Sequence, residues 1–266
     1  MNNYNDPKDI TKEFAASGSY KSSLPAVKFI IIAVLGGVFI AMGGLLSLIV
    51  AGGMAGIGAD NPGLIKFMAG ALFPVGLIMV SITGADLFTS DCTAFTLPLL
   101  EKKLRFVSFL KLLFLSYIFN FAGTQVIAFM LSSNLGYFAA DPWQSYLYHY
   151  TEAKVYQSWG AVFVKGIGAN WLVCLGMFMG YAAKDIIGKC IGIWIPVMIF
   201  VTLGYEHSIA NMFFVPAAIY SGSGITWIDF VCRNLFPATL GNIAGGAICV
   251  GCVYWYLHLY KTKSPS

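Results

Sequence analysis

Two apolar stretches of this sequence are interrupted at matching places, and they decide the fold. Residues 71–91 read ALFPVGLIMVSITGADLFTSD, and residues 193–211 read IWIPVMIFVTLGYEHSIAN. Each stretch has a proline near its start, then a glycine, and then titratable side chains: Asp86 and Asp91 in the first stretch, Glu206 and His207 in the second. Titratable groups are costly in hydrocarbon, so both interruptions are expected to face the inside of a membrane protein.

The composition places the whole chain in a lipid bilayer. Of its 266 residues, 58% are hydrophobic and 11% are charged, and the mean hydropathy is +0.74. Runs long enough to cross a bilayer lie at 27–54, 64–100 (broken), 106–132, 159–183, 191–220 (broken) and 227–259. We therefore predict an all-α membrane protein with six transmembrane helices in one domain at 25–260, flanked by an N-terminal segment at 1–24 and a tail at 261–266.

The basic residues predict the orientation. One side of the predicted spans holds most of them, namely Lys8, Lys12, Lys21, Lys102, Lys103, Arg105, Lys111, Lys184, Lys189, Lys261 and Lys263. The other side holds Lys66, Lys154, Lys165 and Arg233. The positive-inside rule then predicts a multi-pass protein of the cytoplasmic (inner) membrane with both termini in the cytoplasm. The same rule explains the net charge of +4 without a nucleic acid partner.

The polar opening, residues 1–23, does not read as a signal peptide. It suits a short amphipathic helix against the cytoplasmic face, and a disordered tail is the alternative. Cys249 and Cys252 are spaced as in some metal or redox sites, but without a second Cys or His pair helix packing explains them better, so we expect no metal and no cofactor.

The two halves of the chain resemble each other. Aligning the interruptions places Pro74, Gly84, Asp86 and Asp91 over Pro196, Gly204, Glu206 and Asn211. In the next span, residues 111–123 lie over 233–245 and share a basic start and an Asn-x-Ala-Gly ending. Each half has three spans, an odd number, so the second half must enter the membrane in the opposite direction, as an inverted 3+3 repeat with broken second and fifth helices. The alternative is that the glycines only kink two packed helices.

His207 is the side chain best suited to meet a solute in the second interruption. It can hold or release a proton near physiological pH and can donate a hydrogen bond to an anion, although a hydrogen-bonded core histidine is the plain alternative. Thr89, Ser90 and Asn211 add uncharged donors beside half-helix ends, which suits a weak anion site. Asp86 and Glu206 are expected to cap the exposed N–H groups of the half-helices.

Bulky and basic residues around the interruptions have two interpretations each. The bulky apolar residues either form constrictions that exclude water or simply pack in the core. They are Phe73, Leu77, Leu87, Phe88 and Phe200. Lys154 is one of the few bases on the outer side, so it either attracts anions or is an ordinary loop lysine. Asn170, inside the fourth span, either bonds across helices or lines the path.

Three motifs closely resemble those of the formate/nitrite transporter family: ADLFTS at 85–90, GANWLVC at 168–174 and GYEHSIANMF at 204–213. The resemblance implies an aquaporin-like homopentamer with one anion path in each protomer. It also implies that His207 is the central pore histidine and that Thr89 lies on a flexible loop. Asp91 departs from the usual hydroxyl residue after Ser90, and the general character of the sequence is nearest the hydrosulfide branch.

By the same resemblance, Asn170 and Lys154 belong to the outer approach of the path. The resemblance also assigns the constrictions, with Leu77, Leu87 and Phe88 on the inner side and Phe73 and Phe200 on the outer side.

The sequence therefore predicts a passive channel-like transporter for small monovalent anions of weak acids, namely formate, nitrite or hydrosulfide. In it, His207 acts as a hydrogen-bond or proton donor. A channel for water or small neutral solutes is the alternative that the same architecture would serve. An enzyme embedded in the membrane is a further class, but the sequence has no clustered ligands or acid/base pair to support it.

Overall fold

The computed structural model describes residues 4–58 and 60–260, and these residues fold almost entirely into helices, as the sequence predicts. The predicted tail at 261–266 lies outside the described residues. In chain order the α-helices and three π-helical segments (η) are α1 (Pro7–Ser22), α2 (Ala26–Gly52), α3 (Ala55–Gly58), α4 (Pro62–Leu72), α5 (Val75–Thr83), α6 (Phe88–Ala94), α7 (Thr96–Leu100), α8 (Phe106–Gln125), η1 (Val126–Ser133), α9 (Trp143–Val155), α10 (Trp159–Ala182), α11 (Ile186–Thr202), α12 (Ser208–Tyr220), α13 (Trp227–Asp229), η2 (Phe230–Leu235), α14 (Phe236–Ile243), η3 (Ala244–Cys252) and α15 (Val253–His258).

Five continuous helical stretches of the described chain are long and apolar enough to cross a membrane. They are Ala26–Gly52, Pro62–Thr83, Phe106–Ser133, Trp159–Ala182 and Trp227–His258. The predicted fifth span is present as two shorter apolar helices instead, Ile186–Thr202 and Ser208–Tyr220. Length and composition therefore show five candidate spans, and the remaining one is interrupted where the glycine and titratable residues stand.

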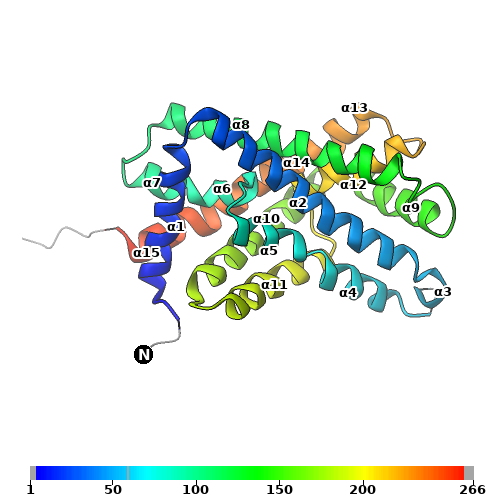
Figure 1. The fold of residues 1–266 in the computed structure, drawn as a ribbon, viewed down its shortest axis with the longest axis horizontal. Coiled ribbons are helices and arrows are strands. Elements are labelled where there is room, and N and C mark those ends of the chain that lie inside the picture. Colours follow the sequence, from blue (N-terminus) through cyan, green and yellow to red (C-terminus); the bar gives the residue numbers. More distant parts are fainter. Residues whose placement is uncertain (1–3, 59, 261–266) are drawn as a thin grey trace, which may run out of the picture.

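The long helices pack in pairs around a central region (Figure 1). Helix α2 lies along α8, and α10 lies along both α11 and α14. The short helices α6 and α12 lie inside this arrangement, where every residue of α6 and most of α12 are buried. Helices α1 and α15 lie at the same end of the bundle, so the first and last described residues share that end.

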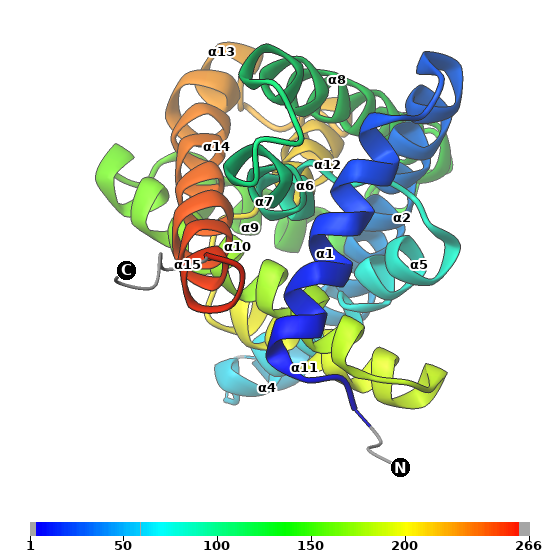
Figure 2. The ribbon, with the colours of Figure 1, turned by 90° about the vertical axis from the view of Figure 1, so that its left-hand side faces the viewer.

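Helix α1 closes one end of the bundle. Figure 2 shows it crossing in front of the other helices, and it packs against α6, α7 and α10. Its apolar side chains Ile10, Phe14 and Ala15 are buried, while Lys8 and Lys12 are exposed. Of the two expectations for the N-terminal segment, the structure has the amphipathic helix.

Glycines of α2 allow very close contacts with neighbouring backbone. A Cβ at Gly36 would lie 1.8 Å from the carbonyl oxygen of Asp86, and one at Gly37 would lie 2.0 Å from that of Asn120. Only a residue without a side chain fits at such distances. Helix α2 is thereby held directly against α8 and against the interruption after α5.

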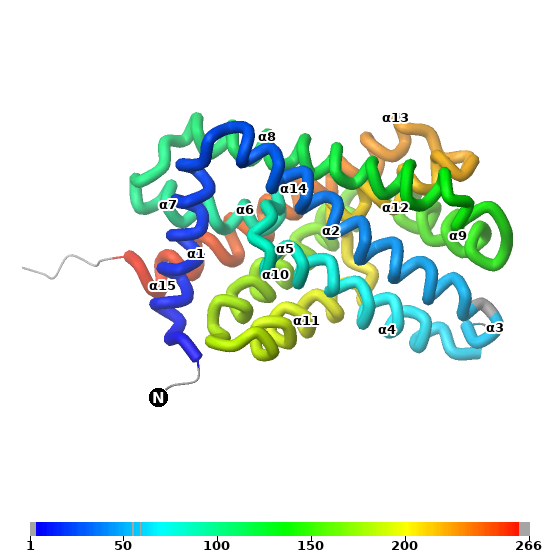
Figure 3. Tube along the Cα trace, viewed as in Figure 1, coloured from blue at the N-terminus to red at the C-terminus, as the bar shows by residue number. Residues whose placement is uncertain are grey.

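Both interruptions turn at a glycine with positive φ. Helix α5 is capped at its C-terminus by Gly84 (φ 75°), and helix α11 is followed, after Leu203, by Gly204 (φ 69°). These left-handed conformations are costly for residues with a Cβ. Figure 3 shows the chain passing from α4 through α5 to the turn before α6, with α11 running beside α4. We call residues 84–88 the first break and residues 204–208 the second break.

Candidate functional site

An asparagine on α8 holds the first break. The Oδ1 atom of Asn120 accepts a hydrogen bond from the backbone N–H of Phe88 at 2.8 Å. Its amide nitrogen donates to the backbone oxygens of Asp86 at 2.9 Å and Ala33 at 2.6 Å. This one buried side chain therefore satisfies two peptide groups of the break, which lipid could not do.

An asparagine on α14 holds the second break through matching contacts. The Oδ1 atom of Asn242 accepts from the N–H of Ser208 at 2.7 Å, and its amide donates to the backbone oxygens of Glu206 at 2.9 Å and Gly166 at 2.8 Å. Both asparagines are fully buried. The two breaks therefore have the same backbone support from two different helices.

The predicted capping role of Asp86 and Glu206 does not agree with the structure. Their carboxylates bind lysine side chains instead, and the N-cap position of α6 is Leu87, which has no side-chain cap. A buried carboxylate is stabilised more by a buried ammonium than by backbone N–H groups, because only the ammonium offsets its charge. The neutral amides of the two asparagines serve the peptide groups.

His207 is the N-cap residue of α12 and faces the first break. Its Nδ1 atom accepts a hydrogen bond from the backbone N–H of Ala210 at 3.0 Å. Its Nε2 atom lies 2.9 Å from the hydroxyl oxygen of Thr89, and its ring stacks on Phe200 with a centroid distance of 5.7 Å. Because Nδ1 accepts, this network assigns the proton of a neutral imidazole to Nε2, which points at Thr89.

Apolar side chains close the space next to His207. Among the residues that line this space are Phe73, Leu77, Leu87 and Phe200, and the volume between them is about 0 Å³. We call this the Leu87 constriction. A gap of this size holds no water, so any solute that passes here loses its hydration.

A small cavity with a positive group lies on the other side of His207. Its lining includes His207, Phe73, Phe200 and Lys154, and its volume is about 10 Å³, the lower limit for one water molecule. We call it the Lys154 cavity. His207 therefore borders both a closed apolar space and a space that is lined by the Lys154 side chain.

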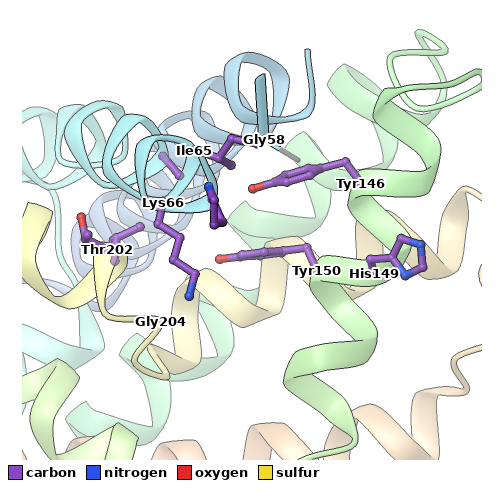
Figure 4. A pocket seen from close by; sticks show the side chains of 11 residues that line it. Gly58, Ile65, Lys66, Tyr146, His149, Tyr150, Thr202 and Gly204 are labelled. Atoms are coloured by element: carbon purple, nitrogen blue, oxygen red, sulfur yellow. The ribbon is translucent and has the colours of Figure 1, made fainter. Parts of the chain in front are cut away.

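A larger cavity follows beyond Tyr150 (Figure 4). Its volume is about 330 Å³, and it shares Tyr150 and Val201 with the Lys154 cavity. The hydroxyl ends of Tyr146 and Tyr150 point toward the side where Lys66 lies, whereas the ring of His149 points away. Burial, assisted by Glu206, raises the pKa of Tyr150, so its hydroxyl stays protonated and can donate. We call this space the Tyr146 cavity.

The Lys21 cavity, of about 140 Å³, lies beyond the Leu87 constriction. Its lining includes Lys21, Ser90, Val80 and Met177. Val80 and Met177 lie one helical turn from Leu77 and Val173, which line the constriction. The Tyr146 cavity, the Lys154 cavity, the constriction and the Lys21 cavity thus form a series with His207 in its middle.

The Lys154 cluster consists of Lys154, Glu206, Asn211, Asn234 and Gln157. The lysine ammonium is 3.2 Å from the Glu206 carboxylate and lies over the ring of Tyr150 at 5.2 Å. The amides of the other three residues donate to the same carboxylate at 2.7–3.1 Å. One positive and one negative group, both buried, therefore pair among amide donors, while the Oδ1 atom of Asn211 has no hydrogen-bond partner among the described residues.

The Lys21 cluster consists of Lys21, Asp86, Asp91 and Ser116. The ammonium of Lys21, on α1, lies 2.6 Å from Asp86 and 2.7 Å from Asp91, and the Ser116 hydroxyl donates to Asp86 at 2.6 Å. Burial lowers the pKa of Lys21, but the two carboxylates outweigh burial and raise it above its ordinary value. The lysine is therefore charged and fastens α1 to the first break.

The remaining predicted site residues lie close by. The Asn170 amide donates to the backbone oxygens of Thr89 at 3.0 Å and Asn242 at 2.6 Å, so it joins the two halves rather than lining one of the cavities above. Ser90 donates to Leu87 and lines the Lys21 cavity. Phe88 packs on Tyr117 with a centroid distance of 4.8 Å and does not line the Leu87 constriction.

Sequence reasoning missed several members of this site. They are Lys21, Ser116, Asn120, Gln157, Asn234 and Asn242. The repeat alignment held the signal for two of them, because Asn120 and Asn242 stand at matching positions of its Asn-x-Ala-Gly endings. Nothing in the local sequence around Lys21 points to a partner in the first break.

Comparisons with known proteins find relatives over nearly the whole chain. The family described as formate/nitrite transporter matches residues 8–256. A probable formate transporter of Methanothermobacter thermautotrophicus is 41% identical and covers 96% of this chain and 98% of its own length. The formate channel BtFdhC of Bacillus thuringiensis is 34% identical and covers 95% of both chains.

Solved structures show the same fold. One described as an FNT family ion channel has a TM-score of 0.86 at 25% identity and covers 94% of this chain and 98% of its own. Another, described as a pentameric formate channel with formate bound, has a TM-score of 0.76 at 29% identity, with coverage of 91% and 98%.

Proposed function

The chain belongs to the formate/nitrite transporter family, and we propose that it passes small monovalent anions of weak acids across the cytoplasmic membrane. The observation that carries this proposal is the position of His207, with its Nε2 atom 2.9 Å from Thr89, between a dry constriction and a cavity that contains Lys154. Formate is the first candidate because two relatives are named for it. Nitrite and hydrosulfide are the others, and the preference for hydrosulfide stays a prediction.

The path begins, in this proposal, at the Tyr146 cavity. Lys66 and the tyrosine hydroxyls there attract and hold an anion, and Lys154 draws it toward His207. The Lys154 ammonium is already paired with Glu206, so it attracts an anion without binding it tightly. Weak binding is what a conducting site requires, since the anion must also leave.

His207 serves as a neutral hydrogen-bond donor at the centre of the path. Its Nδ1 atom accepts from Ala210, and an imidazolium would lose that hydrogen bond because both of its nitrogens are donors. Of the two predicted roles, hydrogen-bond donor and proton donor, the geometry therefore favours the first. In this mechanism the Nε2–H group of His207 turns its hydrogen bond from the Thr89 hydroxyl to the anion. Once the anion has left, the hydrogen bond to Thr89 forms again.

The topology that we propose is an inverted 3+3 repeat with six spans, the second and fifth being broken. The matching contacts of Asn120 and Asn242 support it, as do the paired glycine turns. Helices α1 and α15 lie at one end of the bundle, which we assign to the cytoplasm. The spans make up one channel domain at 25–260, with the N-terminal segment at 1–24.

We further propose a homopentamer with one path in each protomer. The support is the similarity to a pentameric formate channel over nearly the whole chain. Large apolar side chains are exposed on α2 and α8, among them Ile31, Leu35, Leu110 and Phe114. In this assembly such surfaces face either lipid or a neighbouring protomer.

Flux measurements in proteoliposomes test the proposed function. Uptake of formate, nitrite and hydrosulfide is measured side by side with swelling by water and glycerol, and protein-free liposomes serve as the control. We expect anion uptake that the other anions inhibit and no increase in water or glycerol permeability. Water or glycerol permeation without anion uptake would instead establish the alternative of a neutral-solute channel.

A further inference from the structure

The Lys21 cluster contains one more acid group than its counterpart. Asp91 and Asn211 stand at matching positions of the two halves, but Asn211 is neutral and donates to Glu206 at 2.7 Å. Asp91 is a second carboxyl beside the Lys21–Asp86 pair, and both carboxyls contact the same ammonium nitrogen. The Lys154 cluster therefore has one acid, and the ammonium of Lys165 also donates to its Gln157, whereas the Lys21 cluster has two acids for one base.

Burial makes this imbalance costly. Asp86 and Asp91 are both 0% exposed, and the side chain of Lys21 is 12% exposed. The Oδ2 atom of Asp91 has no hydrogen-bond partner among the described residues. Two adjacent buried carboxyls share one ammonium, so the second of them is left without a counter-charge of its own, which is costly inside a protein.

The other titratable groups around the cluster do not supply a second counter-charge. Asp91 has Cys92 beside it on α6 and Cys174 facing it from α10, and both thiols are buried. Ser116, from α8, is neutral and already donates to Asp86. Tyr181 of α10 and Lys189 of α11 line the Lys21 cavity, yet neither forms an ion pair with the two acids within the described parts of the chain.

We propose that Asp91, beside the Lys21–Asp86 pair, binds one exchangeable proton, and that this proton sets whether the Lys21 cavity admits anions. With the proton bound, the cluster is neutral, like the Lys154 cluster. Without it, the cluster carries one net negative charge at a cavity of about 140 Å³ that Lys21 and Ser90 line. The proton exchanges with water of that cavity, which the partly exposed Lys21 side chain reaches.

The direction of the pH effect follows from the charge. A rise in pH on the Lys21 side removes the proton, the cluster becomes negative, and an approaching anion is repelled. One unscreened charge in a partly buried setting changes the local anion concentration by roughly tenfold. This inference rests on the proposed anion path. The residue that makes the flux respond to pH in this way is Asp91.

The test compares Asp91→Asn with the wild-type protein in proteoliposomes over a range of pH on the Lys21 side. The ratio of variant to wild-type formate flux cancels the titration of formate itself. We expect a ratio near one at low pH that rises to roughly ten at high pH. Asp9→Asn removes an exposed acid of α1 that pairs with Lys12, and its ratio should stay near one throughout. A flat ratio for Asp91→Asn would overturn the proposal.

A second readout does not need transport, and its decisive measurement is made on the wild-type protein. Infrared spectra of the solubilised wild-type protein at neutral pH should show the carbonyl stretch of a buried protonated carboxylic acid, which disappears as the pH is raised. Asp91→Asn should lack this band, and Asp9→Asn should keep it. Absence of the band from the wild-type protein refutes the bound proton even if anions are transported. Its presence without anion flux would leave the proton site standing and refute the proposed function.

Discussion

The two breaks share a backbone and differ in side chains. Each turns at a glycine with positive φ, and each rests on a buried asparagine that accepts from the first N–H group of the following helix. At the N-cap position, however, the first break has Leu87 and the second has His207. The shared scaffold gives peptide groups of each break a hydrogen-bond partner, and the differing side chains place an apolar group at one break and an imidazole at the other.

The lysine clusters beside the breaks also occupy similar positions but differ in their side chains. Lys154 and Glu206 form one balanced pair surrounded by amides, whereas Lys21 lies between Asp86 and Asp91. A similar position in the fold therefore does not imply a similar charge state. Two kinds of substitution test how similar the breaks are. One kind gives both breaks the same side chain, and the other removes a matching hydrogen-bond or ion-pair partner from each break so that the effects on stability or uptake can be compared.

The largest effect is expected when Glu206 is removed. In Glu206→Ala the Lys154 ammonium stays buried without a counter-charge, so the free energy of unfolding should fall by about 3–5 kcal/mol. Asp86→Ala should cost clearly less, because Asp91 still contacts Lys21. Thermal unfolding of the purified proteins in detergent measures both. Equal losses would show that the second acid of the Lys21 cluster gives no compensation.

His207→Leu makes the second break resemble the first. The variant loses the Nε2–H donor and the hydrogen bond to the N–H of Ala210. A hydrogen bond to a charged group contributes about 1.5–3 kcal/mol, so formate uptake into proteoliposomes should fall by about tenfold to a hundredfold. His207→Asn, which can still accept from Ala210, serves as the control for the helix cap. Unchanged uptake in the leucine variant would remove His207 from the mechanism.

Asn120→Ala and Asn242→Ala test whether the two breaks have equal support. Each variant leaves buried peptide groups without partners, at a cost of about 1–3 kcal/mol of stability. The two losses, measured by the same unfolding assay, should agree to within about 1 kcal/mol. If only one of the substitutions were tolerated, the matching contacts would not carry matching energies.

The smallest effect is expected at the glycine turns. At Gly84 and Gly204 a Cβ atom would meet no other atom within 4 Å, so alanine there would meet only backbone strain. That strain should cost about 1–2 kcal/mol at each turn, which the same unfolding assay measures. Gly63→Ala is the matched control, since Gly63 is equally open but lies in a helix with ordinary φ, where alanine is favourable. A loss of stability at only one of the turns would show that the two glycines are not equally required.

Much of this architecture could be predicted from the sequence because its signals are local. Apolar runs, the proline and glycine spacing, and titratable residues placed after each glycine indicate helices, breaks and a polar interior within a few residues of one another. The position of His207 in the second break followed from the same spacing. The fold class and the family were predictable for this reason.

The partners of the buried acids were not predictable in this way. The roles expected of Asp86 and Glu206 as helix caps were reasonable for isolated half-helices, but in the folded protein each carboxylate lies beside a lysine from a distant helix. Lys21 and Asp91 are 70 residues apart. Sequence spacing contains no information on such pairs, because they form only after whole helices have packed.

The amino-acid sequence by itself determined which segments are apolar enough for a membrane, where two of them break and which side chains stand in the breaks. Tertiary structure alone decided that asparagines from α8 and α14 support the breaks and that α1 places Lys21 against two acids. The physical reason is the range of the forces involved. Hydrophobicity and backbone conformation act within a segment, whereas a buried charge takes whichever counter-charge the packing of distant helices brings near.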